Sequence, residues 1–200
     1  MTVGRKLAFD KDAALEAAME VFWHKGYVGA SLSELTEAMG INKPSLYGTF
    51  GNKEALFSQA VEKYAQRVSG SYLGLLHESG LPLKERLQRF MTAMLSAQCD
   101  KDSPRGCFIS ACLSESANDD IPESAIEGLY NAHQQMRDTI TQLFQQDEEA
   151  HAYGLDKQAS EHALFICTML SGTAAMARTG KDLSVLSPVI GHTLAALGLE

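Results

Sequence analysis

Apolar residues recur at intervals of three and four positions along almost the whole chain of 200 residues. In the first such segment, Ala14, Ala18, Val21 and Phe22 follow the i, i+4, i+7, i+8 spacing that places side chains on one face of an α-helix. No segment shows the alternation of apolar and polar residues expected of a half-buried strand. The pattern therefore predicts an all-α fold with about nine helices.

Capping residues, glycines and prolines set the limits of the predicted helices. Asp10 can accept N–H groups at the start of the first helix, and Gly26 ends it. "SLSE" from Ser31 is a capping box that opens the second helix, and Gly40 ends that helix. The other helices are expected to follow Asn42 and Asn52 and to cover Pro82–Met94, Ser103–Leu113, Pro122–Phe144, 156–179 and 182–198.

A tight turn at Gly40 joins the second and third predicted helices. The two helices share a small apolar core, to which the spacing assigns Leu35, Met39, Ile41 and Leu46. This is the geometry of a helix-turn-helix, in which the second helix faces outward and can enter the major groove of DNA. The alternative is a structural turn of the kind common in helical proteins.

Short polar side chains beside a glycine form the outward face of the third helix. We expect Lys43 and Ser45 to reach base edges, while Tyr47 and Thr49 reach phosphates. Tyr47 could instead pack between helices. Lys53 lies in the first turn of the fourth helix, where free N–H groups favour a phosphate. With a basic N-terminal arm and the start of the second helix, the candidate DNA contacts are Arg5, Lys6, Ser31, Ser33, Lys43, Pro44, Ser45, Tyr47, Gly48, Thr49 and Lys53.

The net charge of −8 argues at first against a nucleic-acid partner, but the charge is unevenly distributed. Residues 1–70 contain eight Lys/Arg and eight Asp/Glu, which gives zero. Residues 71–200 contain nine Lys/Arg against seventeen Asp/Glu, which gives −8. A neutral first third can bind phosphates if its cations converge on one face.

The stretch "SLSELTEAMGINKPSLYGTFGNKEALF", preceded by "VFWHKGY", resembles the DNA-binding domain of TetR-type one-component transcriptional regulators. The likeness covers roughly residues 8–58 and includes the Gly40 corner, the Leu46–Tyr47 pair and Phe50. Thr36 departs from the family pattern, which more often has alanine on this helix–helix contact. Its hydroxyl can bond back to the preceding turn.

The resemblance implies a helix-turn-helix DNA-binding domain over residues 1–58 and an effector-binding and dimerisation domain over residues 59–200. It also implies a repressor rather than an enzyme. Such a regulator binds a pseudo-palindromic operator in double-stranded DNA as a dimer. An effector, either a small molecule or a reactive compound, spreads the two DNA-binding domains and releases the DNA.

Two C-terminal helices are candidates for a homodimer interface. Helix 156–179 has small residues that permit close approach of another helix, at Ser171, Gly172, Ala174 and Ala175. Helix 182–198 has a stripe of apolar residues, at Leu186, Ile190, Leu194 and Leu197. Two such helices from each chain would form a four-helix interface, and ordinary packing within one chain explains the pattern equally well.

The segment "DSPRGCFISACL" contains a candidate sensor. If Ser103 caps a helix whose first residue is Pro104, then Cys107 ends the first turn. The positive helix end and the nearby Arg105 both favour a reactive thiolate there. A thiolate reacts with oxidants and electrophiles, so Cys107 is a candidate redox switch, with Cys99 as the candidate resolving thiol. TetR-type repressors that respond to N-ethylmaleimide and related electrophiles are similar in this Gly-Cys region, and so is a copper-responsive branch. The alternative is that Cys107 is simply a core residue.

Aromatic and methionine side chains at helical spacing could line an effector pocket or could be ordinary core. The candidates are Phe90, Met94, Phe108, Met136, Phe144, Phe165 and Met169.

The sequence gives less support to a metal-binding protein, a secreted or membrane protein, or an enzyme. The four cysteines form no C-x-x-C pair and no two histidines have the i, i+4 spacing of helical metal ligands, so we expect reduced thiols in a cytoplasm, with no bound metal or cofactor. No stretch has the features of a signal peptide or a membrane span. The rival interpretation is a thiol-dependent enzyme with Cys107 as nucleophile. The sequence contains no catalytic motif to accompany this cysteine, and the interpretation leaves the first 58 residues unexplained.

Overall fold

The computed structural model describes residues 9–115 and 121–199, and every regular element in these ranges is helical. The all-α prediction is confirmed. In chain order the elements are α1 (Lys11–Gly29), α2 (Leu32–Ala38), α3 (Lys43–Phe50), α4 (Lys53–Ser71), the 3-10 helix η1 (Leu73–His77), α5 (Leu83–Gln98), α6 (Phe108–Leu113), α7 (Glu123–Gln146), α8 (Glu148–Ala152), the 3-10 helix η2 (Leu155–Gln158), α9 (Ala159–Arg178), α10 (Leu183–Leu186) and α11 (Pro188–Ala196).

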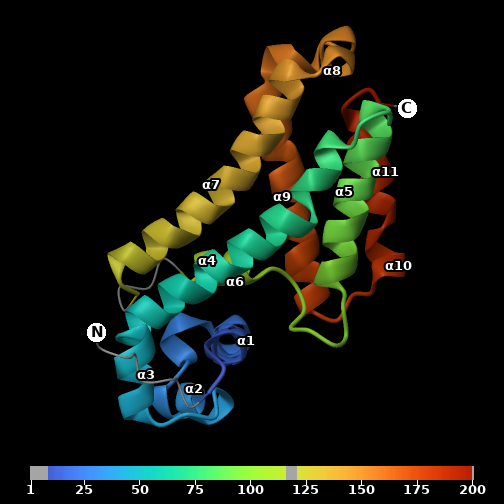
Figure 1. Ribbon diagram of the computed structural model, residues 1–200. Helices are drawn as coiled ribbons and strands as arrows, with labels where there is room; N and C mark the ends of the chain where they lie inside the picture. Colours follow the sequence, from blue (N-terminus) through green and yellow to red (C-terminus); the bar gives the residue numbers. More distant parts are fainter. Residues whose placement is uncertain (1–8, 116–120, 200) are drawn as a thin grey trace.

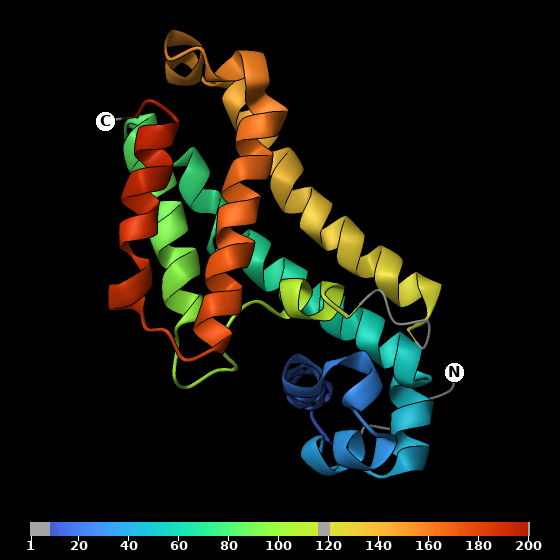
Figure 2. The same ribbon diagram turned by 180° about the vertical axis from the view of Figure 1, so that it is seen from behind.

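The first three helices and the start of α4 form a head at one end of the molecule (Figure 1). From this head α4 and α7 run side by side toward the far end, where α8 lies. The helices α5, α9, α10 and α11 form a second group, which Figure 2 shows from the side where α9 and α11 are nearest the viewer. The helix α4 therefore belongs to both parts of the molecule.

Buried apolar side chains gather in two clusters. The body core contains residues of α5, α7, α9 and α11, including Phe90 and Phe144, which are fully buried. The head core contains α1 to α4 together with α6 and the start of α7, and Phe108 of α6 lies against Phe57 of α4 with ring centroids 5.9 Å apart. The domain boundary predicted between residues 58 and 59 falls inside α4, and the packing does not divide there.

The corner between α2 and α3 is built from local hydrogen bonds. Gly40 has φ of 63°, the left-handed conformation that a side chain disfavours. The Gly40 N–H bonds to the Glu37 carbonyl at 3.1 Å and the Ile41 N–H to that of Thr36 at 3.0 Å, which is a Schellman ending. The Thr36 hydroxyl bonds back to the Leu32 carbonyl at 2.9 Å, as the sequence predicted.

Several predicted helix boundaries are wrong. The first helix is only kinked at Gly26 and continues to Gly29, and the helix expected over Pro82–Met94 continues to Gln98. The helix expected from Ser103 begins only at Phe108, because the chain turns at Gly106, whose φ is 91° and whose N–H bonds to the Gln98 carbonyl at 2.8 Å. The helix expected over 182–198 is divided before Pro188, which lacks the N–H needed to continue the ladder. The stretch between Gln146 and Leu155, which no predicted helix covers, contains α8, capped by the side chain of Asp147.

Candidate DNA interface and effector cavity

Helix α3 presents its polar face to solvent. Asn42 caps it by accepting the Ser45 N–H at 2.8 Å, and Pro44 occupies the first turn, where a missing N–H costs no intrahelical bond. Leu46 and Phe50 point into the head core. Tyr47 is 50% exposed, so it does not pack between helices.

The predicted contacts on α3 share this outward face. Lys43, Pro44, Tyr47 and Gly48 are exposed, while Ser45 and Thr49 are half-buried. Among the described residues, an added Cβ at Gly48 would meet no atom within 4 Å, so packing in this part of the chain does not require a glycine there. A small residue at this point leaves room for a partner surface to approach the helix.

The two predicted DNA contacts at the start of α2, Ser31 and Ser33, differ in whether their side chains are free. Ser31 and Glu34 form a capping box: the Ser31 hydroxyl accepts the Glu34 N–H at 3.2 Å, and the Ser31 N–H donates to Glu34 Oε2 at 3.0 Å. The hydroxyl also donates to Oε2 at 2.8 Å, so it is already engaged. Hydrogen bonds from Lys25 and then from Ser31 lower the pKa of Glu34 to about 2. Ser33 is exposed on the same helix.

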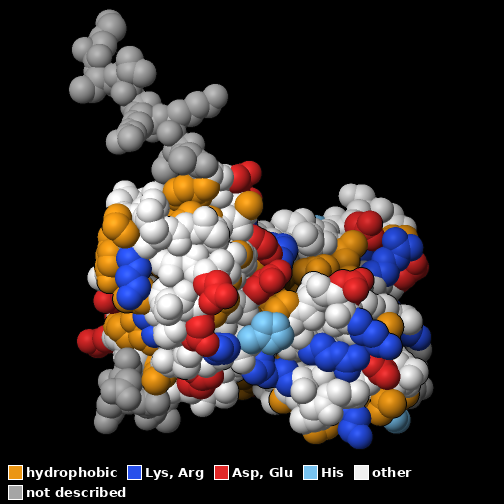
Figure 3. Space-filling view, turned by 90° about the horizontal axis from the view of Figure 1, so that it is seen from below, with side chains coloured by type: hydrophobic (Ala, Val, Ile, Leu, Met, Phe, Trp, Pro, Cys, Tyr) orange, Lys and Arg blue, Asp and Glu red, His pale blue; other side chains and the backbone are white. Residues whose placement is uncertain are grey.

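Lys53 opens α4 beside the corner of α1. Its ammonium lies 4.5 Å from the centroid of the Tyr27 ring, a cation–π contact, and burial lowers its pKa. Arg5 and Lys6, the predicted arm, lie outside the described residues. Figure 3 views this end of the molecule: the head is mostly uncharged in this view, and Lys and Arg gather on the neighbouring lobe.

A small cavity of about 40 Å³ lies among α4, α5, α6 and α7. Its walls are mostly apolar, and the polar groups that reach it include a thiol, a phenol and an imidazole. The residues that line it are Tyr64, Ala65, Val68, Leu73, Met94, Cys107, Ile109, Ser110, Ala132, His133, Gln135 and Met136.

The Cys107 sulfur lies on one wall of this cavity and is half-buried. Cys107 precedes α6 as its N-cap residue instead of ending a first turn, and its side chain caps no N–H. Arg105 pairs with Asp182 at 3.0 Å. The environment that the sequence predicted for the thiol is therefore wrong, since it rested on a helix that would start at Pro104.

Tyr64, which the sequence reasoning missed, supplies the polar contact of Cys107. Tyr64 is 6% exposed, and its phenol lies beside the Cys107 side chain and the Phe108 backbone. Burial, and then the neighbouring Cys107, raise the pKa of Tyr64 well above its usual value, so the phenol keeps its proton. Nothing in the local pattern of α4 marks Tyr64 as more than one position of a buried stripe.

The other three cysteines have different surroundings. Cys99 packs against the body core with its sulfur 3.9 Å from the Lys181 carbonyl oxygen, and burial raises its pKa. Cys112 and Cys167 are buried, and burial raises the pKa of both, to about 11 for Cys167.

The structure brings together only two of the residues predicted to line an effector pocket. Met94 and Met136 line the cavity. Phe90 and Phe144 lie in the body core and Phe108 in the head core, while Met169 packs against the body core. Phe165 is 43% exposed on α9. The sequence assigns it to a pocket because helical spacing alone does not tell an inward stripe of apolar residues from an outward one.

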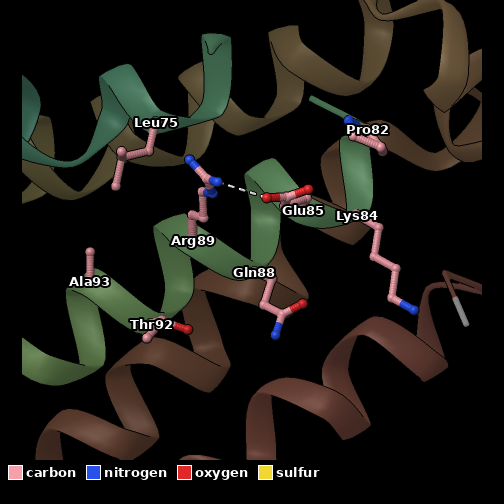
Figure 4. A pocket seen from close by; sticks show the side chains of 8 residues that line it. All are labelled: Leu75, Pro82, Lys84, Glu85, Gln88, Arg89, Thr92 and Ala93. Atoms are coloured by element: carbon pink, nitrogen blue, oxygen red, sulfur yellow. Dashed lines mark hydrogen bonds and ion pairs between the residues drawn. The ribbon is translucent and has the colours of Figure 1, made fainter. Parts of the chain in front are cut away.

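A larger groove of about 720 Å³ follows the outer face of α5 (Figure 4). It is open and lined largely by charged and polar side chains, among which Arg89 and Glu85 form an ion pair at 2.7 Å. A shallow, charged surface of this kind lacks the enclosed apolar walls of a ligand site.

The outer face of α9 and α10 carries exposed apolar side chains. They are Leu164, Phe165, Met176, Leu183 and Val185. The leucines and isoleucine that the sequence assigned to a dimer, by contrast, are buried in the body core of their own chain: Leu186, Ile190, Leu194 and Leu197. For these four residues the structure shows the alternative that the sequence left open, packing within one chain, because helical periodicity does not distinguish the two.

Within the described residues, no group of three or more His, Cys, Asp or Glu side chains could hold a metal ion. A search of the same residues finds no helix with the length and apolar character needed to cross a membrane.

Comparison with known proteins gives consistent matches over the chain. Residues 14–60 match the bacterial regulatory proteins of the tetR family, and residues 84–191 match the tetracyclin repressor-like C-terminal domain. The HTH-type transcriptional repressor ComR of Escherichia coli (strain K12) is 32% identical over 193 residues, which are 96% of this chain and 90% of that protein. The repressor BdcR of the same strain is 26% identical over 187 residues, 92% of this chain and 86% of that protein.

A solved structure of similar shape shows a related protein on DNA. It is a cysteine mutant of the TetR family transcriptional regulator CifR, complexed with 26bp double-strand operator DNA. Its TM-score to this chain is 0.85 at 31% sequence identity, over 96% of this chain and 99% of that one.

Proposed function

This chain belongs to the tetR family of bacterial regulatory proteins, and we propose that it is a repressor that binds double-stranded operator DNA as a homodimer. It is a helix-turn-helix transcriptional regulator. The observation that carries the proposal is the polar, exposed face of α3 on a head whose corner and caps are those of a DNA-reading unit. Relatives over nearly the whole chain are named transcriptional repressors.

In this proposal α3 lies in the major groove. Lys43 and Ser45 read base edges from the first turn of the helix, and Tyr47 and Thr49 bind phosphates. Lys53 reaches a phosphate at the N-terminus of α4, and must leave the Tyr27 ring to do so. Arg5 and Lys6 complete the interface as an arm.

The homodimer is proposed to form through the outer face of α9 and α10. Leu164, Phe165 and Met176 on α9 and Val185 on α10 are exposed apolar side chains. Large apolar side chains that gather on an exposed helix face are typical of an interface. A two-fold axis there would place two heads on one pseudo-palindromic site.

The signal is proposed to act through Cys107. This thiol lines a cavity whose wall includes α4, and α4 begins in the head at Lys53. A group added to the sulfur must displace the wall of so small a cavity, and the displaced helix carries part of the DNA interface. Effector and DNA then favour different positions of the head, so each weakens the binding of the other.

Two alternatives account for fewer observations. A thiol-dependent enzyme leaves the exposed face of α3 unexplained, and the relatives are named as regulators. A metal-responsive regulator of the same fold would need ligands that the described residues do not gather.

Salt dependence of binding tests the DNA proposal. Fluorescence anisotropy with the intergenic DNA upstream of the protein's own gene should show specific binding that weakens steeply as salt rises, because phosphate contacts release counterions. Equal affinity for an unrelated duplex of the same length would contradict a specific operator at that site.

A further inference from the structure

Arg178, in the last turn of α9, connects the body core directly to the head. Its Nη1 donates a hydrogen bond of 3.1 Å to the carbonyl oxygen of Trp23 in α1. The arginine side chain is exposed, but the bond itself is partly buried. Since α9 belongs to the body core and Trp23 to the head core, this bond crosses the junction between the two parts of the molecule.

The Trp23 carbonyl lies where α1 needs a donor from outside the helix. Gly26, in the next turn, has the non-helical angles φ 70° and ψ 179°, so the hydrogen-bond ladder of α1 is interrupted there. Carbonyl groups before such an interruption lack helical donors and form the negative end of the helix dipole, which favours a cation. The Trp23 ring is 5% exposed and packs edge-on against Tyr64, with centroids 5.1 Å apart. The acceptor is therefore fixed within the head core.

The part of α9 that carries the arginine is anchored by a buried polar network. Gln98, the last residue of α5, is 3% exposed. Its amide nitrogen donates to the Leu170 carbonyl of α9 at 3.0 Å, and its amide oxygen accepts the Thr173 hydroxyl at 2.8 Å. Its backbone carbonyl accepts the N–H of Gly106 at 2.8 Å. These bonds hold the second half of α9 to α5, so its last turn has little freedom to shift.

Two other connections keep the head attached when the arginine bond is absent. The helix α4 runs from the head into the rest of the molecule, and α6 packs against both α1 and α9. The carboxylate of Glu115, just beyond α6, lies against Gly26, where a side chain on the glycine would collide with it. Loss of the Arg178 bond is therefore expected to let the head turn, without separating it from the body core.

Resting on the proposed homodimer through α9 and α10, we propose that Arg178 is a positioning residue for operator recognition, which sets the angle of the head relative to α9 and thereby the half-site spacing that the dimer accepts. In such a dimer the two-fold axis is fixed relative to α9. Each α3 must then meet a major groove about 34–36 Å, or a multiple of this distance, from the other. A head that turns more freely binds the native spacing less tightly and tolerates altered spacings better.

The test compares affinities for operators that differ only in spacing. Footprinting locates the site upstream of the protein's own gene, and duplexes are then made with one or two base pairs inserted or removed between its half-sites. Anisotropy titrations of the wild type and Arg178→Met give the ratio of the Kd for each altered duplex to the Kd for the native one. Methionine keeps an unbranched stem beside Gly106 but has no donor for the Trp23 carbonyl. The ratio should fall about fivefold in the variant, as expected on losing one hydrogen bond.

Two further variants separate positioning from stability. Arg178→Lys keeps the cation at the interrupted end of α1 and should recover part of the wild-type ratio. Arg89→Ala removes a surface arginine of α5 and should keep the wild-type ratio. A purely structural role for Arg178 would reduce the amount of folded protein and weaken binding to every duplex in proportion. The ratio would then stay at its wild-type value, which would overturn the inference.

A second substitution keeps the test decisive if Arg178→Met does not fold. Arg178→Gln places a polar side chain at this exposed position of α9, and glutamine is too short to replace the guanidinium at the Trp23 carbonyl. It should lower the ratio as Arg178→Met does. An unchanged ratio in either folded variant would overturn the inference.

The same titrations separate this inference from the proposed function. A wild-type protein that binds no duplex specifically would overturn both. A wild type that binds its operator but accepts every spacing equally would overturn the positioning role and leave the DNA-binding repressor standing. Strong preference for the native spacing in the wild type, reduced in Arg178→Met, would support both.

Discussion

The guanidinium of Arg178 donates a 3.1 Å hydrogen bond to the carbonyl oxygen of Trp23. Arg178 lies in the last turn of α9 and Trp23 in α1, so the helix of the proposed dimer interface is tied directly to the head. The same side chain covers Gly106, where an added Cβ would lie 2.7 Å from the Arg178 Cγ. The turn at Gly106, which precedes Cys107, therefore packs against Arg178, the residue that bonds to α1 of the head.

Replacing Arg178 should loosen this connection. Arg178→Ala is expected to lower the free energy of unfolding by about 1 kcal/mol, the value of one partly buried hydrogen bond. Urea denaturation followed by circular dichroism measures the change. Arg89→Ala is the matched control: its ion pairs with Glu78 and Glu85 are on the surface, so it should leave the free energy of unfolding nearly unchanged. Equal effects of the two variants would contradict a special role for Arg178.

The corner of α1 requires a glycine. Gly26 has φ of 70° and ψ of 179°, and an added Cβ would collide with the carboxylate of Glu115, which accepts the Tyr27 N–H. Gly26→Ala should destabilise the protein by about 1–3 kcal/mol, the cost of a strained backbone position, with a lower Tm. Gly70→Ala, on α4 with open space around it, should be neutral or stabilising. A Gly26→Ala protein as stable as the Gly70→Ala control would show that the corner is not needed.

Lys43 is expected to contribute directly to operator recognition. Lys43→Ala should weaken specific binding by about 1–3 kcal/mol if the ammonium contacts a base edge. Anisotropy titrations against specific and unrelated duplexes distinguish this from a phosphate contact, which would weaken both equally. Lys84→Ala removes the same charge from α5, away from the head, and should leave affinity unchanged. Unaltered operator affinity in Lys43→Ala would rule out its assigned role.

Phe165 tests the homodimer. Phe165→Glu places a charge in the exposed apolar face of α9 and should shift the protein toward monomer in sedimentation velocity, because an unpaired charge is costly inside an interface. Tyr153→Glu, an exposed aromatic beyond α8, is the control and should leave the assembly unchanged. If both variants stay dimeric, the interface lies elsewhere.

What the sequence predicted well was local. The Ser31 capping box, the Gly40 corner and the outward face of α3 depend on bonds between residues a few positions apart, and each is present in the structure. Ser103 and Pro104 also looked like a helix start, but the turn at Gly106 is held by a bond to Gln98 and by Arg178, which no local pattern reveals.

The grouping of residues around the cavity could not be predicted either, because it depends on contacts between residues distant in sequence. Tyr64 and Cys107 are distant in sequence, and only the packing of α4 against the start of α6 brings the phenol to the sulfur. The assignment of the last helix's apolar residues to a dimer interface was limited in a related way. Helical periodicity does not distinguish side chains buried within one chain, such as Leu194, from those that cover a second copy.

An operator titration of wild-type protein, Cys107→Ser and Cys99→Ser, each with and without methyl vinyl ketone, tests the thiol signal on DNA binding. All three untreated proteins should bind specifically, and the treated wild type and Cys99→Ser should release the DNA, while Cys107→Ser stays bound. Release of Cys107→Ser to the same extent as the wild type would show that Cys107 is not the sensor.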